Sequence, residues 1–182
     1  MRIIRTEIEG LNIIEPRVFK DSRGYFFESY NERDLRKKGL DLHFVQINES
    51  RSAFGVIRGL HYQLNPRAQT KLVRVLQGKI WDVAVDLRRD SPTFLKWHGS
   101  DLSSDNKRQL LIPKGFAHGF SVLSECAVVL YKCDDYYAPE MEAGIRYNDE
   151  RIGIDWKIDP GKYILSEKDM KLPGIEDARM NF

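Results

Sequence analysis

Short strand-like runs separated by turn residues constrain the fold of this chain more than any other feature. In the run Ile80 to Leu87 every second residue is large and apolar, which places these side chains on one face of a strand and Asp82, Ala84 and Asp86 on the other. The preceding run, Lys71 to Leu76, is joined to it by Gln77-Gly78, and this glycine-containing pair predicts a hairpin turn. The remaining strand-like runs are Gly10 to Val18, Tyr25 to Tyr30, His43 to Asn48, Gln109 to Ile112, Gly119 to Leu123 and Ala127 to Tyr136.

Helical patterns are few. Asn31 to Gly39 has a capping residue at its start, acids in its first turn, lysines in its last and a glycine stop, which predicts one short surface helix. A second helical turn is expected from Ser166. Because the strands do not alternate with helices, we expect an all-β antiparallel sandwich or barrel of the jelly-roll type with a few short peripheral helices.

The length of 182 residues favours one domain over residues 1–182, since single domains commonly span roughly 100–200 residues. The formal net charge is +2, and charges of both signs are interspersed along the chain. This balance argues against a nucleic-acid partner, which would require a strongly basic surface. It leaves room for a small-ligand protein with a mildly basic site.

The two cysteines, Cys126 and Cys133, have no CxxC spacing and are expected to be free and buried. The N-terminal residues MRIIRTEIEG lack the apolar stretch of a secretory signal. No run approaches the roughly 18 consecutive apolar residues of a membrane span, so no membrane association is predicted. We therefore expect a cytoplasmic protein.

Two of the four histidines lie in unusual local sequences. His61 follows a glycine in VIRGLHYQ, and His118 ends a P-x-G-x-x-H run in IPKGFAHGF. The second pattern is typical of cupin jelly rolls, which place such a histidine at the mouth of the barrel. A metal-binding cupin usually has another histidine two residues after the first, but Gln63 stands there, and Lys71 would oppose a cation. We therefore expect no metal site.

Without a metal, the cavity would hold Arg58, His61, Lys71, His118 and Tyr131. A neutral histidine can act as a general base near pH 7, and cationic side chains can stabilise an oxyanion on a carbonyl oxygen. A tyrosine on another strand could return the proton from the opposite side. This set suits proton abstraction next to a carbonyl, although the basic residues could equally be solvated strand positions and the tyrosine a core residue.

Several motifs together resemble one known family. The runs FKDSRGYFFE, QINES, GVIRGLHYQ, QTKLVRVLQGKIWDVAVDLR, LIPKGFAHGF and ILSEKD are similar to those of the dTDP-4-dehydrorhamnose 3,5-epimerases, the RmlC-type cupins. The likeness extends from about Phe19 to Asp169. It implies a cupin that inverts both carbons flanking the keto group of dTDP-4-dehydro-6-deoxy-D-glucose, giving dTDP-4-dehydro-L-rhamnose without cofactor or metal. It also implies a homodimer with shared active sites.

The resemblance assigns roles residue by residue. His61 matches the base, Asp169 the carboxylate that orients it, Tyr131 the acid that reprotonates, and Lys71 the residue that steadies the enolate. Tyr137 matches the side chain that stacks on thymine. The other implied substrate-binding residues are Arg58 and His118 beside the sugar and diphosphate, Gln46, Ile47 and Asn48 at the nucleotide, Glu142 and Lys168 as further contacts, and Arg23 and Glu28 from the partner subunit.

Asp169 and Tyr137 also have competing explanations. Ser166-x-x-Asp169 reads as a helix-capping pattern, which would explain the acid without catalysis. Tyr137 follows Tyr136, and on a strand only one of the two can face a pocket. Beyond single residues, a single-site epimerase, a ketoisomerase on a related dTDP-keto-sugar and a non-catalytic sugar-nucleotide-binding cupin remain as alternatives.

Overall fold

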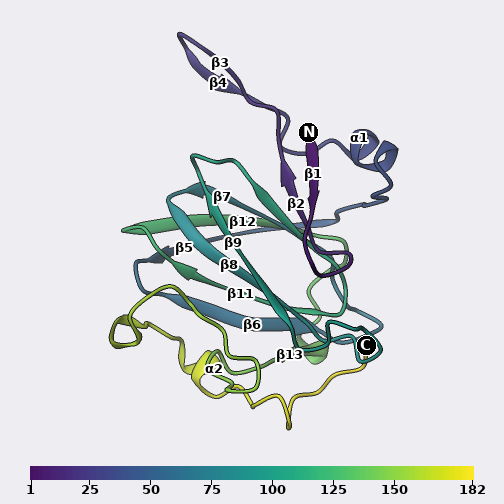
Figure 1. Ribbon diagram of the computed structural model, residues 1–182, viewed down its shortest axis with the longest axis vertical. Helices are drawn as coiled ribbons and strands as arrows, with labels where there is room; N and C mark the ends of the chain where they lie inside the picture. Colours follow the sequence, from purple (N-terminus) through teal and green to yellow (C-terminus); the bar gives the residue numbers. More distant parts are fainter.

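The computed structural model describes residues 1–182, and most of its strands form two antiparallel sheets packed face to face, with a separate two-stranded sheet beside them (Figure 1). The prediction of an all-β sandwich is confirmed. The six-stranded sheet has the order β1 (Arg2–Arg5), β2 (Asn12–Glu15), β10 (Gln109–Ile112), β7 (Lys71–Gln77), β12 (Cys126–Cys133) and β5 (Gln46–Ala53). The five-stranded sheet has the order β13 (Glu142–Gly144), β6 (Ile57–Gln63), β11 (Phe116–Val122), β8 (Lys79–Asp86) and β9 (Trp97–Ser103).

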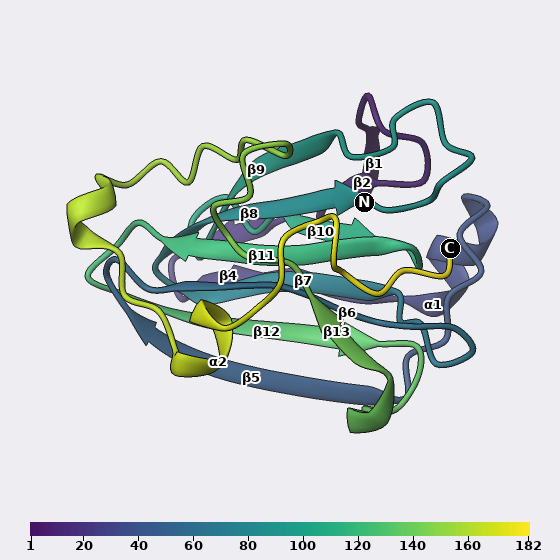
Figure 2. The same cartoon turned by 90° about the horizontal axis from the view of Figure 1, so that it is seen from below.

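The alternation in β8 distributes its side chains as the sequence predicts. Ile80 and Ala84 join the core between the sheets, where they meet Val73 and Val75 of β7. Val83 and Val85 face the other way, into a second apolar cluster with residues of the C-terminal segment. Figure 2 shows that segment, in yellow, crossing the outer face of the five-stranded sheet. Both faces of β8 are therefore buried, including Asp82 and Asp86.

The predicted hairpin at Gly78 is wrong. Strand β7 pairs with β10 and β12, whereas β8 pairs with β11 and β9, so the tight turn carries the chain from one sheet to the other. Gly78 has a φ of +78° and packs so closely on the backbone of Cys126 that a side chain would collide with it. Gly78 forms the tight turn that the sequence predicts, but a turn residue does not determine which strands pair with each other.

The two helices begin where the sequence indicates. Helix α1 (Glu32–Lys37) is capped by Asn31, whose side chain accepts a hydrogen bond from the backbone of Asp34. Helix α2 (Glu167–Met170) is capped in the same way by Ser166. Two 3-10 turns, η1 (Pro139–Met141) and η2 (Pro160–Lys162), complete the helical content. Observed strand limits differ from the expected ones by several residues, most clearly in β5, which begins at Gln46.

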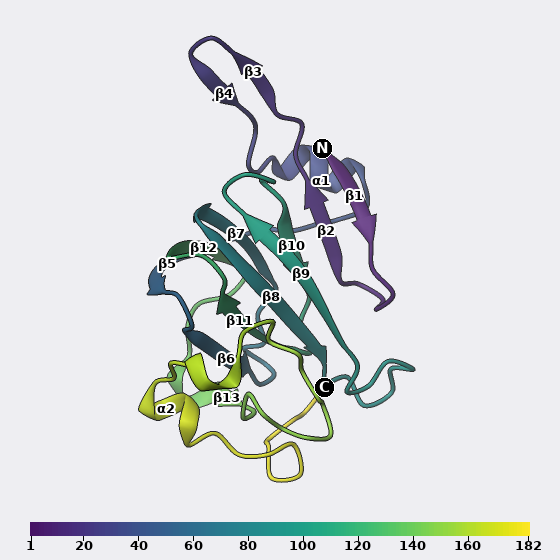
Figure 3. The same cartoon turned by 60° about the vertical axis from the view of Figure 1, so that its left-hand side comes forward.

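A two-stranded arm, β3 (Phe19–Asp21) and β4 (Gly24–Phe26), projects away from the sandwich (Figures 1 and 3). Its aromatic side chains Phe19, Tyr25 and Phe26 are all half or more exposed, although Nζ of Lys107 lies 3.9 Å from the centre of the Tyr25 ring. The arm lies at the opposite end of the molecule from α2 in Figure 3. It therefore presents an apolar surface away from the body of this chain.

Candidate active site

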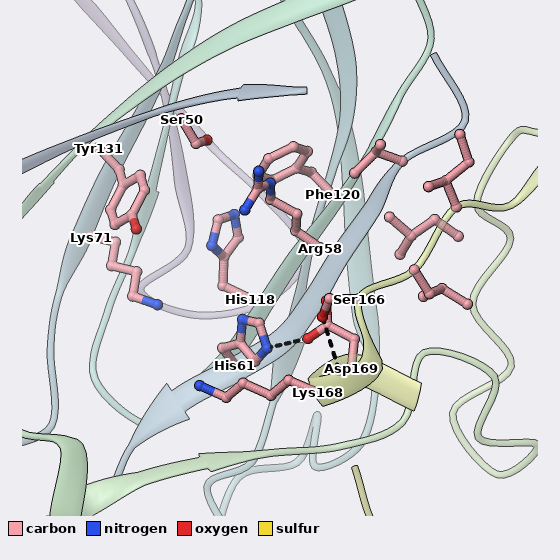
Figure 4. A pocket seen from close by; sticks show the side chains of 14 residues that line it. Ser50, Arg58, His61, Lys71, His118, Phe120, Tyr131, Ser166, Lys168 and Asp169 are labelled. Atoms are coloured by element: carbon pink, nitrogen blue, oxygen red, sulfur yellow. Dashed lines mark hydrogen bonds and ion pairs between the residues drawn. The ribbon is translucent and has the colours of Figure 1, made fainter. Parts of the chain in front are cut away.

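A cavity of about 490 Å³ opens between the sheets and is lined by charged, imidazole and phenol groups (Figure 4). An adjoining cavity of about 460 Å³ shares five of its lining residues, so the two form one continuous cleft. Of the residues expected to be catalytic or to touch the sugar, the inner cavity brings together His61, Lys71, Tyr131, Asp169, Arg58, His118 and Lys168.

Strand β6 and helix α2 place His61 beside Asp169. The Nε2 of His61 lies 2.7 Å from Oδ1 of Asp169, and only 5% of the Asp169 side chain is exposed against 31% for His61. The backbone amide of Asp169 also donates to the Ser166 hydroxyl. The cap and the histidine contact thus coexist, because the cap uses the backbone of Asp169 and leaves its carboxylate free to contact the imidazole.

The His61 contact also sets the charge state of Asp169. Burial by itself would raise the pKa of Asp169, but the hydrogen bonds of His61 and Ser166 and the charges of His61 and Arg58 outweigh it, so its pKa lies below the usual value. A carboxylate held ionised next to an imidazole fixes the ring tautomer and increases its basicity. With Nε2 directed at Asp169, the Nδ1 of His61 remains to accept a proton.

His118 lies directly across from His61 where β11 pairs with β6. Its Nε2 is hydrogen-bonded to Oδ1 of Asp82 on β8. Gly59 makes this close pairing possible: it has a φ of +120°, and an added Cβ would lie 2.6 Å from the Cα of Gly119. The glycine in the GLH motif therefore permits the two histidine-bearing strands to approach.

Lys71 and Tyr131 come from neighbouring strands of the other sheet, and Figure 4 shows them across the cavity from His61 and Asp169. Burial lowers the pKa of Lys71, against the opposing charges of Cys133, Asp82 and Glu142. Burial raises the pKa of Tyr131, which keeps its hydroxyl protonated near neutral pH. The cavity therefore has an imidazole acceptor on one side and a phenol donor on the other.

The outer cavity is lined by Gln46, Asn48, Tyr137 and Glu142. The Tyr137 hydroxyl donates to Glu142 at 2.8 Å, and Nζ of Lys168 donates to both oxygens of the same carboxylate at 2.7 Å. Burial would raise the pKa of Glu142, but its hydrogen bonds with Lys168 and Tyr137 hold it below the usual value. An ionised carboxylate therefore fixes two side chains at the mouth.

Arg58 lines both cavities, and its Nε donates to the hydroxyl of Ser52 at 2.9 Å. This bond uses one edge of the guanidinium. The terminal nitrogens make one further contact, a 3.5 Å bond to the carbonyl of Arg51. A guanidinium oriented in this way suits a diphosphate.

Three expected residues lie elsewhere in this chain. Arg23 sits at the tip of the projecting arm, bonded to Asp21 with 87% of its side chain exposed, and Glu28 accepts from Asn31 outside the cleft. Ile47 is also outside, because its neighbours Gln46 and Asn48 face the cleft and the strand period turns Ile47 to the opposite face, 58% exposed. The Ile47 side chain therefore does not line the cleft within this chain, and its expected place at the nucleotide remains a prediction.

The orientation of Tyr136 and Tyr137 is not determined by strand alternation, contrary to what the sequence had suggested. Both Tyr136 and Tyr137 lie past the end of the strand at Cys133, so strand alternation does not apply to them. Both are exposed, and only Tyr137 lines the cleft.

Sequence reasoning missed Ser50 and Asp82. Ser50 lines both cavities, and its buried hydroxyl has no hydrogen-bond partner. The signal was available, because Ser50 follows Gln46 and Asn48 at the two-residue period of β5. The two-residue period predicts only that Asp82 shares a face with Ala84 and Asp86, and nothing in the local sequence connects it with His118, which lies 36 residues away.

No three or more His, Cys, Asp or Glu side chains come together in the structure so that they could hold a metal ion. Both cysteines are free. The structure contains no helix with the length and apolar character needed to cross a bilayer.

Comparison with known proteins identifies the family of this chain. The family model for dTDP-4-dehydrorhamnose 3,5-epimerase matches residues 5–177. The Escherichia coli dTDP-4-dehydrorhamnose 3,5-epimerase is 55% identical over 178 residues, covering 97% of this chain and 96% of the relative.

Two crystal structures have the same fold. The Elizabethkingia anophelis dTDP-4-dehydrorhamnose 3,5-epimerase superposes with a TM-score of 0.93 at 52% identity, covering 97% of both chains. The Legionella pneumophila dTDP-6-deoxy-D-glucose-3,5-epimerase, in complex with dTDP-4-keto-L-rhamnose, has a TM-score of 0.92 at 50% identity, covering 97% of this chain and 93% of that chain. The predicted cupin fold is thus confirmed, and this chain belongs to the dTDP-4-dehydrorhamnose 3,5-epimerase family.

Proposed function

We propose that this protein is a dTDP-4-dehydrorhamnose 3,5-epimerase that converts dTDP-4-dehydro-6-deoxy-D-glucose into dTDP-4-dehydro-L-rhamnose. The observation that carries the proposal is the pairing of His61 with Asp169 on one side of a cavity whose other side holds Lys71 and Tyr131. Proton abstraction, charge stabilisation and reprotonation from the opposite face require this set of groups.

His61 acts as the base. With its Nε2 proton directed at Asp169, the lone pair on Nδ1 removes the proton from the carbon next to the 4-keto group. The positive charge that forms on the ring is stabilised by the buried carboxylate 2.7 Å away. The electrons of the broken C–H bond move to the carbonyl oxygen and give an enolate.

Lys71 stabilises the enolate oxygen. A cation in a water-poor cavity interacts with a developing negative charge more strongly than it would in water. The charge on Lys71 has to be maintained against burial, which lowers its pKa. The neighbouring carboxylates of Asp82 and Glu142 oppose that effect.

Tyr131 donates its own hydroxyl proton to the other face of the carbon, which inverts the configuration there and leaves the tyrosine as a phenolate. Burial raises the pKa of its hydroxyl, so the group is a proton donor at neutral pH, and an enolate carbon is basic enough to receive the proton. His61 then releases the abstracted proton to solvent and Tyr131 takes one up from solvent, after which repetition at the second carbon flanking the keto group completes the reaction.

The nucleotide occupies the outer cavity in this proposal. Arg58 contacts the diphosphate, His118 and Lys168 further oxygen atoms of the ligand, and Gln46 and Asn48 the nucleotide. Tyr137 stacks on the thymine ring from its position beside Glu142. The inner cavity then holds the sugar, with its keto group near Lys71.

We further propose a cytoplasmic homodimer in which each arm reaches the cleft of its partner. The support is the arm itself, which carries exposed Phe19, Tyr25 and Phe26 away from its own sandwich. Arg23 and Glu28 would then complete the partner's nucleotide site. Sedimentation analysis should give the mass of a dimer, and Arg23→Ala should raise KM for the substrate.

The test of the proposed function is isotope exchange. The protein is incubated with the keto-sugar nucleotide in deuterated water, and the ring protons are followed by NMR. Deuterium should enter both carbons flanking the keto group, and His61→Ala should abolish entry at both. Entry at only one carbon would identify a single-site epimerase, and no entry would refute the proposal. Full activity after treatment with a chelator is expected, since the mechanism uses side chains alone.

A further inference from the structure

A second histidine–carboxylate pair adjoins the inner cavity: His118 lines it, and Asp82 lies behind His118. Asp82 is completely buried, and its Oδ1 accepts the hydrogen bond from Nε2 of His118. Since His118 pairs with His61 across β11 and β6, the two pairs flank the same space. In the proposed mechanism Asp82 acts only indirectly, as one of the charges that oppose the lowering of the Lys71 pKa.

Asp82 lacks the full set of hydrogen bonds that a purely structural buried carboxylate would accept. Its Oδ2 is buried and has no hydrogen-bond partner. Asp86, two residues further along the same face of β8, provides the contrast, because it accepts hydrogen bonds from Arg88, Ser91 and Thr93. A buried carboxylate oxygen without a partner destabilises the fold, which favours a role for Asp82 in the cavity.

The bond to Asp82 determines which atom of His118 can meet the substrate. A carboxylate accepts a hydrogen from Nε2 and thereby selects the tautomer protonated there. Nδ1 is then the only ring nitrogen not used by the protein, on a side chain that lines the cavity.

The charge of Asp82 also acts on Lys71. Burial lowers the pKa of Lys71, and Asp82 is one of the groups that raise it. The titratable and charged groups that act on Lys71 or line the cavities with it are Cys133 and Tyr131 from β12, Asp82 from β8, Arg58, His61 and Tyr62 from β6, His118 from β11, Glu49 from β5, Glu142 from β13, Lys168 and Asp169 from α2, and Tyr137. Among these, Asp82 is the one carboxylate with no exposed surface, so solvent screens its charge least.

We propose that Asp82 is a positioning residue of this active site: it holds His118 with Nδ1 available to the substrate, and its negative charge keeps Lys71 protonated to receive the enolate. The inference rests on the proposed epimerase function.

Asp82→Asn tests it, because the substitution removes the charge and keeps the shape. The variant should lower kcat roughly tenfold or more at pH 7. The alkaline limb of its pH–kcat profile should move to lower pH, since Lys71 loses its proton more readily without the nearby charge. Asp86→Asn is the matched control: it changes another buried carboxylate on the same face of the same strand. It should lower the melting temperature while leaving kcat and the alkaline limb unchanged.

Two outcomes would overturn the inference: a folded Asp82→Asn protein with wild-type kcat and an unmoved alkaline limb, or an equal loss in Asp86→Asn. Binding of dTDP by calorimetry shows whether Asp82→Asn is folded. Nitrogen-15 NMR of the ligand-free wild type gives a test that needs neither the variant nor activity. The His118 ring should be protonated at Nε2, and protonation at Nδ1 alone would overturn the inference. Failure of the proposed function would appear separately, as no deuterium exchange by the wild type.

Discussion

Replacement of Asp169 by asparagine removes the charge beside His61 and preserves the size of the side chain. The contact it weakens is a 2.7 Å hydrogen bond to a carboxylate that is only 5% exposed. Hydrogen bonds to charged groups contribute roughly 1.5–3 kcal/mol. The imidazolium forms as the proton is abstracted, so the loss is expressed in the transition state. Since about 1.4 kcal/mol corresponds to a factor of ten in rate, kcat should fall by about 10- to 150-fold.

Deuterium entry into the substrate, followed by NMR near neutral pH, measures this loss at both carbons. Glu167→Gln is the matched control, because it neutralises an acid in the same helix whose side chain is 88% exposed and faces Lys171 at 3.9 Å. It should exchange at the wild-type rate. An Asp169→Asn protein that retains more than half of the wild-type kcat would refute the claim that this carboxylate activates His61, as would an equal loss in Glu167→Gln.

The same substitution has a predictable effect on acid stability. The pKa of Asp169 in the folded protein lies below its ordinary value of 3.8, because its hydrogen bonds and neighbouring charges outweigh burial. A depressed pKa adds stability above the unfolded value, and that stability is lost as the pH falls through the folded value. The difference in unfolding free energy between wild type and Asp169→Asn should therefore shrink below pH 4, as measured by urea denaturation.

Three further predictions address stability, backbone geometry and reprotonation. The hydrogen bonds of Asp86 outweigh its burial and lower its pKa from 3.8 to about 2, which corresponds to roughly 2 kcal/mol of stability, present above pH 4 and lost toward pH 2; urea titrations should show this loss in wild type and not in Asp86→Asn. Gly59→Ala should destabilise the fold by about 1–3 kcal/mol and lower kcat, because the new Cβ meets the backbone of Gly119; an unchanged melting temperature would contradict the reasoning. Tyr131→Phe should retain deuterium entry by His61 and lose inversion, which NMR coupling constants distinguish; inversion at the wild-type rate would exclude Tyr131 as the donor.

The local features were readable from the sequence because they depend on neighbouring residues. The two-residue period of β8 correctly predicted which side chains share a face. Asn31 and Ser166 correctly marked where α1 and α2 begin, since a capping side chain bonds to a backbone amide within the next turn.

Strand pairing was not readable in the same way. The predicted hairpin at Gly78 failed because the turn residue fixes only the reversal of the chain, and β7 and β8 pair with other strands in different sheets. The orientation of Ile47 was not readable either: the motif marks a stretch of chain, and the strand period turns the Ile47 side chain away from the cleft within this chain.

The sequence by itself therefore determined the fold class, the helix starts, the turn positions and, through its motifs, the family. Only the tertiary structure decided that the carboxylate of Asp169 meets His61, 108 residues away, while its backbone completes the cap with Ser166. The tertiary structure likewise brought Asp82 within hydrogen-bonding distance of His118. Propensities and caps act over a few residues, whereas these pairs form only when closure of the two sheets brings distant strands within hydrogen-bonding distance and excludes water from between them.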